Sequence, residues 1–301
     1  MCFTGVVPTR YTTARQNRRR DLVNFTVRCR GPFFRKTEEK ERGNPMKVTF
    51  RDLLNSGHRF IGTYMMSPDD NGLEAMKLAG VDFVIFDLEH EQLTLTEVMH
   101  LIRTAEACGM ATMVRVPGLD EGMIKKALDM GASAIKIPGV SSAEEAALAV
   151  SYCKYPPEGI RGSCPFVRCN DYGTNRENCY AEANRQVVVS VIVEGVEGVK
   201  NLEEIIATPG LDTISVGNVD LSCALGVPGQ VFHPLVMQAV LDAADLCEKY
   251  GKSCSVQVVD GKDAERFKGY KGVSHYHTDL PTAMLYKAYK GLCDDLKSVG
   301  E

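Results

Sequence analysis

Residues 79–90, AGVDFVIFDLEH, contain the pattern that determines the fold. A glycine is followed by an apolar run at 83–88, which gives way to acidic residues and a histidine. An apolar run without alternation is typical of a parallel strand that is covered on both faces. A helical pattern with an apolar period near 3.6 precedes this run at 70–79, and another follows at 95–108. The stretch therefore predicts a strand between two helices, with polar groups at its carboxyl end.

The same unit recurs from Met46 onward. Short β-rich runs, most of them nearly continuously apolar, occur at 60–65, 83–88, 112–116, 134–138, 187–194, 212–217, 253–258 and 272–277. Helical patterns separate them at 70–79, 95–108, 119–130, 141–153, 197–207, 234–250 and 260–268, and a last one covers 279–298. Glycines stand between a helix and the next strand, where a helix end favours positive φ, at Gly80, Gly109, Gly131, Gly210, Gly251 and Gly272.

Eight such units predict an α/β fold, a (β/α)8 TIM barrel in which residues 46–301 form a single domain. A doubly wound open sheet is the alternative, but it seldom needs eight units. Neither GxGxxG nor GxxxxGK[ST] follows the first strand, so a dinucleotide or P-loop site has no support. The connection at 155–186 is long for a compact domain, and connections of this length are usually functional.

Residues 1–45 differ in composition from the rest of the chain. They contain eleven Lys and Arg against four Asp and Glu and no Ser, a net charge of +7 that leaves about −11 for the remainder. An organelle transit peptide would be rich in Arg and poor in acids, but also rich in Ser. We therefore favour a misplaced start, with Met46 as the true beginning. In either case we expect a disordered extension, because the segment cannot bury enough apolar surface to offset its ordering entropy.

The overall composition narrows the class of protein. The net charge of −4 argues against nucleic acid as the main partner, and no apolar run is long enough to span a membrane. The eleven cysteines form no CxxC pair, and the chain begins without a secretory signal. Scattered cysteines of this kind fit a reducing compartment better than a disulfide scaffold. We therefore expect a cytoplasmic protein that acts on small molecules.

Polar residues collect at the carboxyl ends of four predicted strands, the end at which TIM barrels carry their active sites. They are Asp87, Glu89 and His90 on the second strand, Arg115 on the third, Glu194 on the fifth and Asp220 after the sixth. Each has a plain structural explanation, such as a helix cap or an ion pair. Glu194 and Asp220, however, end neighbouring strands and would repel each other unless a cation lies between them. A hard divalent ion held by carboxylate oxygens and water is the simplest prediction.

These residues lie in segments that resemble the HpcH/HpaI family of metal-dependent pyruvate aldolases, over about residues 50–297. The matching segments are GTYMMSP, AGVDFVIFDLEHEQL, VRVPG, ALDMGASAIKIPGVSSAEEA, YPPEGIRG, VIVEGVEGVKNLEEI and PGLDTISVGNVDLSCALG, followed by HP at 233–234. Their order and their positions on the predicted strands agree with the family.

The resemblance implies a chemical role for five residues. Glu194 and Asp220 would be the ligands of Mg²⁺, Mn²⁺ or Co²⁺. His90 would be the acid–base group, and Asp87 the carboxylate paired with it. Arg115 would be the cation beside the keto-acid oxygen.

Other matched positions concern the substrate and the assembly. Tyr64, Gly217 and Asn218 would line the substrate site together with the catalytic arginine, and Arg161 would lie near the mouth of the barrel. Tyr64 and Asn218 stand where the family has Trp and Pro, and Ile192 stands where it often has Gln, which bears on the natural substrate. The resemblance also implies a homo-oligomer, a hexamer or trimer of dimers, whose last helix packs on another subunit.

The predicted enzyme is a carbon–carbon lyase that cleaves a 4-hydroxy-2-keto acid reversibly to pyruvate and an aldehyde. The metal would act as a Lewis acid on the developing enolate, and Arg115 would add a fixed positive charge. His90 would take the proton of the aldol hydroxyl as general base. Either Asp87 or Glu89 would fix the tautomer of His90.

Alternatives to this mechanism stay open. A Schiff-base aldolase would use Lys136 as nucleophile, although we prefer a lysine that faces solvent or a carboxylate. A citrate-lyase-type enzyme would act on a dicarboxylate or acyl-CoA, although no basic, Gly-rich phosphate site is evident. A non-enzymatic barrel would show degraded catalytic positions, which this chain does not. His275 and His277 alternate on the eighth strand and so face the same side, but two histidines are weak evidence for a second metal site.

Overall fold

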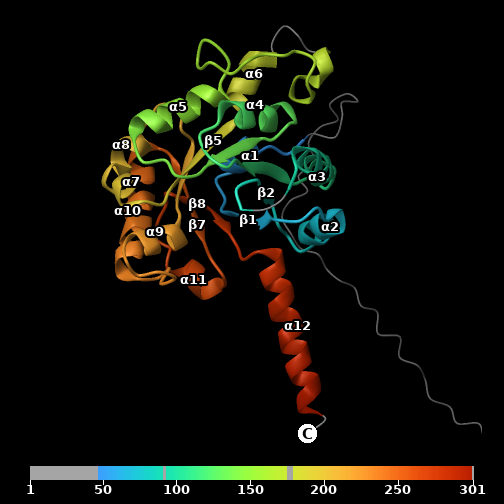
Figure 1. The fold of residues 1–301 in the computed structure, drawn as a ribbon, viewed down its shortest axis with the longest axis vertical. Helices are drawn as coiled ribbons and strands as arrows, with labels where there is room; N and C mark the ends of the chain where they lie inside the picture. Colours follow the sequence, from blue (N-terminus) through green and yellow to red (C-terminus); the bar gives the residue numbers. More distant parts are fainter. Residues whose placement is uncertain (1–46, 91–92, 175–178, 300–301) are drawn as a thin grey trace, which may run out of the picture. The chain divides into compact units, whose positions relative to one another are not determined.

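The computed structural model describes residues 47–90, 93–174 and 179–299, within a compact unit that spans 44–301. Its strands are β1 (Phe60–Met65), β2 (Phe83–Asp87), β3 (Ala111–Arg115), β4 (Ala134–Ile137), β5 (Val188–Val193), β6 (Thr213–Val216), β7 (Ser253–Gln257) and β8 (Val273–His277). They pair in sequence order, each parallel to its neighbours, and β1 closes on β8 with Phe60 opposite His275. Figure 1 shows the helices arranged around this closed barrel. The predicted TIM barrel is confirmed, and the open sheet is excluded.

The helices follow the predicted order with several differences. Their bounds are α1 (Phe50–Asn55), α2 (Asp70–Leu78), α3 (Leu95–Ala107), α4 (Glu121–Asp129), α5 (Ala143–Cys153), η1 (Arg168–Gly173), α6 (Cys179–Gln186), α7 (Val196–Lys200), α8 (Leu202–Ala207), α9 (Asn218–Ala224), α10 (Pro234–Tyr250), α11 (Gly261–Glu265) and α12 (Pro281–Ser298). The single helix predicted at 197–207 is divided at Asn201 into α7 and α8. The helices α1, α6, α9 and η1 were not predicted from the sequence, because six to eight residues are too few to show a clear helical period.

Helix α1 closes the amino-terminal end of the barrel. It begins in a capping box, in which the Thr49 hydroxyl accepts from the Asp52 N–H and the Asp52 carboxylate accepts from the Thr49 N–H. Its Phe50 is fully buried and meets the rings of Phe60 and Phe83 edge-on, with centroids 5.3 Å and 5.0 Å away. The amino-terminal part of the barrel interior is therefore an aromatic core.

The interior becomes polar toward the carboxyl ends of the strands. Along β4, Ile135 and Ile137 pack in the core between barrel and helices, so the alternation of the strand turns Lys136 inward. By the same alternation Ser190 of β5 and Ser255 of β7 face the interior, and both are buried. The two ends of the barrel interior thus differ in chemistry.

Five of the six glycines predicted to have a positive φ do have one, and the exception is Gly272. A Cβ atom at Gly272 would lie 1.9 Å from the backbone oxygen of Ala244. Glycine is required there because α10 packs directly on the backbone that enters β8. Among the described residues, no helix is long and apolar enough to cross a membrane.

Candidate active site

Arg115 and Asp87 form the centre of the site at the carboxyl ends of β2 and β3. The two residues are opposite each other in the β2–β3 register. Arg115 donates from Nε to Asp87 Oδ1 at 2.9 Å and from Nη2 to Oδ2 at 2.6 Å, and the Asp87 side chain is completely buried. A two-point contact with a buried carboxylate fixes both the position and the plane of the guanidinium group.

Glu89 connects this pair to His90. Its Oε2 lies 3.1 Å from Arg115 Nη1 and 3.6 Å from His90 Nε2, in both cases as an ion-pair contact rather than a hydrogen bond. The His90 side chain is 58% exposed, so its ring can meet a ligand that enters from solvent. The expected pairing of Asp87 with His90 is wrong in this structure. In the β2–β3 register Asp87 lies opposite Arg115 and binds it. Glu89, which lies beyond the end of β2, is the carboxylate that contacts His90.

Tyr64 of β1 lies beneath the guanidinium group. The Arg115 Cζ atom is 4.7 Å from the centre of the Tyr64 ring, a cation–π distance. Burial raises the pKa of Tyr64 to about 12, so its phenol stays neutral at physiological pH. Burial alone would lower the pKa of Arg115, but its hydrogen bonds with Asp87 raise it overall. Arg115 is thus held from two sides as a permanent cation.

Glu194 and Asp220 supply the second group of carboxylates. Glu194 follows β5 directly, and Asp220 lies in the first turn of α9, after β6. Burial raises the pKa of Glu194, and the negative charges of Asp220 and Glu89 raise it further. Gly217 allows this arrangement, because a Cβ atom there would lie 2.8 Å from Glu194 Oε2. Asn218, the first residue of α9, follows at the same edge.

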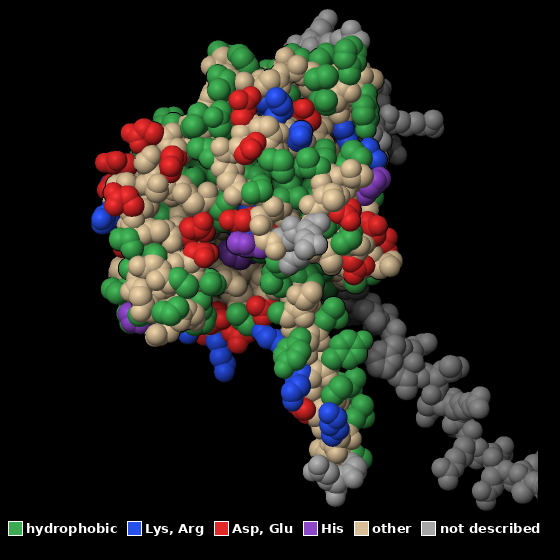
Figure 2. Space-filling model, viewed as in Figure 1, with side chains coloured by type: hydrophobic (Ala, Val, Ile, Leu, Met, Phe, Trp, Pro, Cys, Tyr) green, Lys and Arg blue, Asp and Glu red, His purple; other side chains and the backbone are tan. Residues whose placement is uncertain are grey.

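These residues fit a divalent cation. The negative charge of Asp220 adds to burial in raising the pKa of Glu194, and a cation between the two carboxylates would relieve this repulsion. Carboxylate oxygens are the ligands that Mg²⁺ and Mn²⁺ prefer. Within the described ranges no three His, Cys, Asp or Glu side chains converge on one point. An ion here would therefore take its other ligands from water and substrate, as Mg²⁺ commonly does. Figure 2 shows acidic and histidine side chains around a hollow near the centre of this face.

The prediction that Lys136 faces solvent or a carboxylate is wrong. It is 1% exposed and lies inside the barrel, opposite Arg115 in the β3–β4 register. Burial, followed by the positive charge of Arg115, lowers its pKa to about 7. The alternation in Ala134–Ile137 could have shown this, because the isoleucines on both sides of Lys136 need the outer core.

His275 and His277 face the same side of β8, as predicted, but pack against aromatic rings. His275 stacks on Phe60 with centroids 4.9 Å apart, and His277 meets Tyr64 edge-on at 5.8 Å. Burial and the charge of Lys136 lower the pKa of both histidines well below the usual value. Within the described ranges, no group of three His, Cys, Asp or Glu side chains converges around them. A second metal site at this position has no support.

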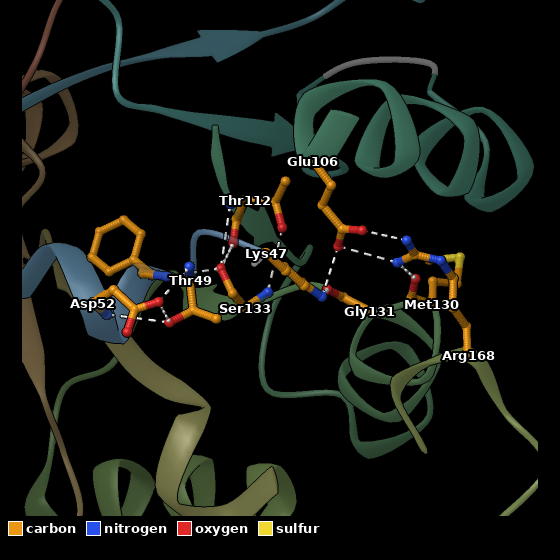
Figure 3. A network of polar contacts seen from close by, with 10 residues as sticks. Lys47, Thr49, Asp52, Glu106, Thr112, Met130, Gly131, Ser133 and Arg168 are labelled. Atoms are coloured by element: carbon orange, nitrogen blue, oxygen red, sulfur yellow. Dashed lines mark hydrogen bonds and ion pairs between the residues drawn. The ribbon is translucent and has the colours of Figure 1, made fainter. Parts of the chain in front are cut away.

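Arg161 lies at the opposite end of the barrel from the mouth, so the expected position is wrong. It binds Asp129, the last residue of α4, with Nη2 2.6 Å from Oδ1. Helices run back from the mouth in this fold, so their carboxyl ends lie at the amino-terminal end of the barrel. A polar network continues there (Figure 3), in which Lys47 Nζ contacts Glu106 at 2.7 Å and Gly131 O at 2.8 Å, and Arg168 also binds Glu106. This network was not predicted from the sequence, because its members come from helix ends and loops.

Known proteins are similar to this chain in both fold and sequence. The model of the HpcH/HpaI aldolase/citrate lyase family matches residues 61–272. A 2-dehydro-3,6-dideoxy-6-sulfogluconate aldolase of Pseudomonas putida is 35% identical over 191 residues, 64% of this chain and 74% of that protein. A 5-keto-4-deoxy-D-glucarate aldolase of Salmonella paratyphi C is 37% identical over 218 residues, 72% of this chain and 85% of that protein.

A solved structure gives the same result. The crystal structure of an HpcH/HpaI aldolase/citrate lyase family protein from Burkholderia cenocepacia J2315 has a TM-score of 0.76 and 29% identity, and covers 81% of this chain and 97% of that one. These matches confirm the predicted enzyme class, a carbon–carbon lyase of the aldolase kind. Because the family model spans the segments that carry the mouth residues, the chain belongs to the HpcH/HpaI aldolase/citrate lyase family.

Proposed function

We propose that the protein catalyses the reversible, metal-dependent aldol cleavage of a 4-hydroxy-2-keto acid to pyruvate and an aldehyde. The observation that carries the proposal is the fixed Arg115, clamped by Asp87 and Glu89 beside the carboxylates Glu194 and Asp220. A fixed cation next to a pair of mutually repelling carboxylates suits a reaction in which negative charge develops on a ketone oxygen. The two aldolase relatives act, by name, on sugar acids, and we infer a hydroxylated keto acid here as well.

Each residue of the site has a place in this reaction. Glu194 and Asp220 would hold Mg²⁺, Mn²⁺ or Co²⁺, which as a Lewis acid would polarise the keto-acid oxygens. Arg115 stabilises the enolate oxygen without reorganising, because Asp87 already holds its guanidinium group in place. His90 takes the proton from the aldol hydroxyl and returns it in the reverse direction, and Glu89 orients its ring. Tyr64, Gly217 and Asn218 would line the keto-acid site.

Schiff-base catalysis by Lys136 is the second candidate, and one observation favours it. A pKa near 7 leaves a large fraction of the amine neutral and nucleophilic at physiological pH. A mechanism that uses Lys136 alone, however, leaves Glu194 and Asp220 without a role. The two mechanisms differ in whether they form a covalent adduct and in whether they need a metal.

Two treatments separate the mechanisms. We expect a chelator to abolish pyruvate release from 4-hydroxy-2-keto acids, Mg²⁺, Mn²⁺ or Co²⁺ to restore it, and borohydride with pyruvate to leave the protein mass unchanged. Glu194→Gln and Asp220→Asn should each weaken metal binding, measured by calorimetry, and lose activity in parallel. Activity that resists the chelator, together with a reduced pyruvyl adduct on Lys136, would establish the Schiff-base mechanism instead.

We also propose that the protein is a homo-oligomer, joined through α12. None of the residues of this helix is buried within the chain, although it carries large apolar side chains. Leu285, Tyr289, Leu292 and Leu296 are spaced four, three and four residues apart, which places them on one face. Figure 2 shows hydrophobic side chains along its length. A hexamer and a cytoplasmic location stay predictions.

A further inference from the structure

Lys136 is a buried amine with no counter-ion at hydrogen-bond distance. No hydrogen bond to a described residue stabilises its ammonium group; the influences on it are burial and charges at a distance. Burying an unpaired charge is unfavourable, so a lysine in this position is uncharged much of the time unless an anion joins it. A methionine or leucine would fill the same space without that cost.

The surroundings of Lys136 are polar but do not complete its hydrogen bonds. The buried hydroxyls of Ser190, Ser215 and Ser255 also lack a hydrogen-bond partner among the described residues. Ser190 is the register neighbour of Lys136, and Ser255 is the neighbour of Ser215. Buried polar groups are normally paired, so several unpaired groups in one region indicate a place where a polar ligand or water completes them.

Titratable groups on four elements interact electrostatically with Lys136. Arg115 of β3 lowers its pKa, whereas Cys254 of β7 and Glu194 beyond β5 raise it. On β8, His275 and His277 both feel the charge of Lys136, and burial keeps both neutral. Lys136 is therefore a titratable cation inside the barrel, in register with Arg115 of the site.

The net charge of the mouth indicates what a cation at this position could do. Asp87, Glu89, Glu194 and Asp220 carry four negative charges, whereas Arg115 and one divalent ion would supply three positive charges. The mouth would therefore have one negative charge in excess before any substrate enters. A keto acid brings a further negative charge, and Arg115 is already shared between Asp87 and Glu89. Protonation of one buried amine would offset the added charge.

We propose that Lys136 is a substrate-binding residue: its ammonium group donates to an anionic oxygen of the bound keto acid, and it takes up a proton from solvent as the keto acid binds. The inference rests on the proposed function, because it needs an anionic ligand at the mouth. No bond other than the N–H bond forms, and the proton comes from the buffer. In this proposal Lys136 becomes a cation when the substrate binds, and it does not act as a nucleophile.

The proposal determines how binding depends on pH. In the free protein the pKa of Lys136 is about 7, and an adjacent anion raises it. Below pH 7 the amine is already charged, so affinity is highest there. Above pH 7 it must gain a proton on binding, so affinity falls by up to about tenfold per pH unit until the pKa of the complex is reached. A divalent ion at Glu194 and Asp220 would lower the pKa of the free amine further, which keeps the same direction.

Calorimetry of the full-length, Mg²⁺-loaded protein with oxalate, an analogue of the pyruvate enolate, tests this directly. Binding heats at about pH 8 in two buffers of different ionisation enthalpy give the number of protons taken up. We expect an uptake approaching one proton for the wild type and none for Lys136→Met. Lys126→Met, which changes an exposed lysine of α4, should keep the wild-type uptake.

Each other outcome has a defined meaning. Oxalate that binds the wild type without proton uptake overturns the role of Lys136 and leaves the aldolase proposal standing, whereas failure to bind at all overturns both. Equal uptake by the wild type and Lys136→Met assigns the proton to another group and also overturns the inference. If Lys136→Met does not fold, the fall in wild-type affinity above pH 7 and the loss of uptake in Lys136→Arg, which is always charged, provide the same test.

Discussion

Arg115 is the residue on which the site depends, and its position is fixed before any substrate binds. Asp87 binds it at two points from the neighbouring strand, Glu89 contacts it from beyond that strand, and Tyr64 lies beneath it. A charge held in this way does not have to reorganise when an oxyanion develops. The same contacts make Arg115 structurally important, because Asp87 is completely buried.

His90 and Arg115 should therefore respond differently to removal. His90→Ala should lower kcat by about 100-fold or more and leave the melting temperature unchanged, because the side chain is largely exposed. Arg115→Ala should lower kcat at least as much and also destabilise the fold by roughly 3–5 kcal/mol, because it leaves Asp87 buried and unpaired.

Turnover of 4-hydroxy-2-keto acids with added Mg²⁺ and thermal unfolding measure the two effects. His100→Ala, an exposed histidine of α3, is the control and should match the wild type in both. Turnover close to that of the wild type in His90→Ala or Arg115→Ala would remove that residue from the mechanism.

Helix α12 has no buried residue against the described parts of the chain, although it carries large apolar side chains. Its stripe of Leu285, Tyr289, Leu292 and Leu296 ranges from 53% to 65% exposed. A stripe of this kind on a helix usually packs against another apolar surface. A second copy of the chain is the partner that the proposed oligomer supplies.

A charge on that stripe should therefore break the assembly. We expect Leu292→Glu to lower the mass measured by light scattering after gel filtration, because a buried carboxylate without a partner is costly at an interface. Lys290→Glu places the same charge on the other side of the helix and should leave the mass unchanged. A wild-type protein that is monomeric, or a Leu292→Glu variant of unchanged mass, would contradict the role of α12.

At the scale of the whole molecule, the barrel is closed at one end and open at the other. Helix α1 inserts Phe50 between Phe60 and Phe83 at the closed end, and Lys47 joins the polar network around Glu106. Lys47 is therefore the first residue of the described chain that contacts this end of the barrel. The residues expected to be a disordered extension, 1–45, lie outside the described ranges.

A chain that starts at Met46 should keep the melting temperature and turnover of the full chain, because it retains Lys47 and α1. A chain that starts at Ser56 should lose both, because removal of α1 uncovers the aromatic core at Phe60 and Phe83. Thermal unfolding and turnover of the two truncated proteins make the comparison. A marked loss of stability in the chain from Met46 would give residues 1–45 a structural role.

The barrel, most of its elements and the residues at its mouth could be predicted from local patterns in the chain. Strands such as Phe83–Asp87 and Val188–Val193 are predicted almost to the residue, because a buried parallel strand needs an uninterrupted apolar run and the polar residue that ends it is local information. The same property places Asp87, Arg115 and Glu194 at one end of the barrel, since parallel strands all end on the same side.

Which of these groups touch depends on how the elements pack against one another. Asp87 binds Arg115 instead of His90 because of the β2–β3 register, and Lys136 enters the interior because its neighbours fill the outer core. Arg161 lies at the closed end because the helices reverse the direction of the chain. Such contacts depend on the phase and direction of elements that are distant in sequence, and periodicity within one segment carries no information about its register with another.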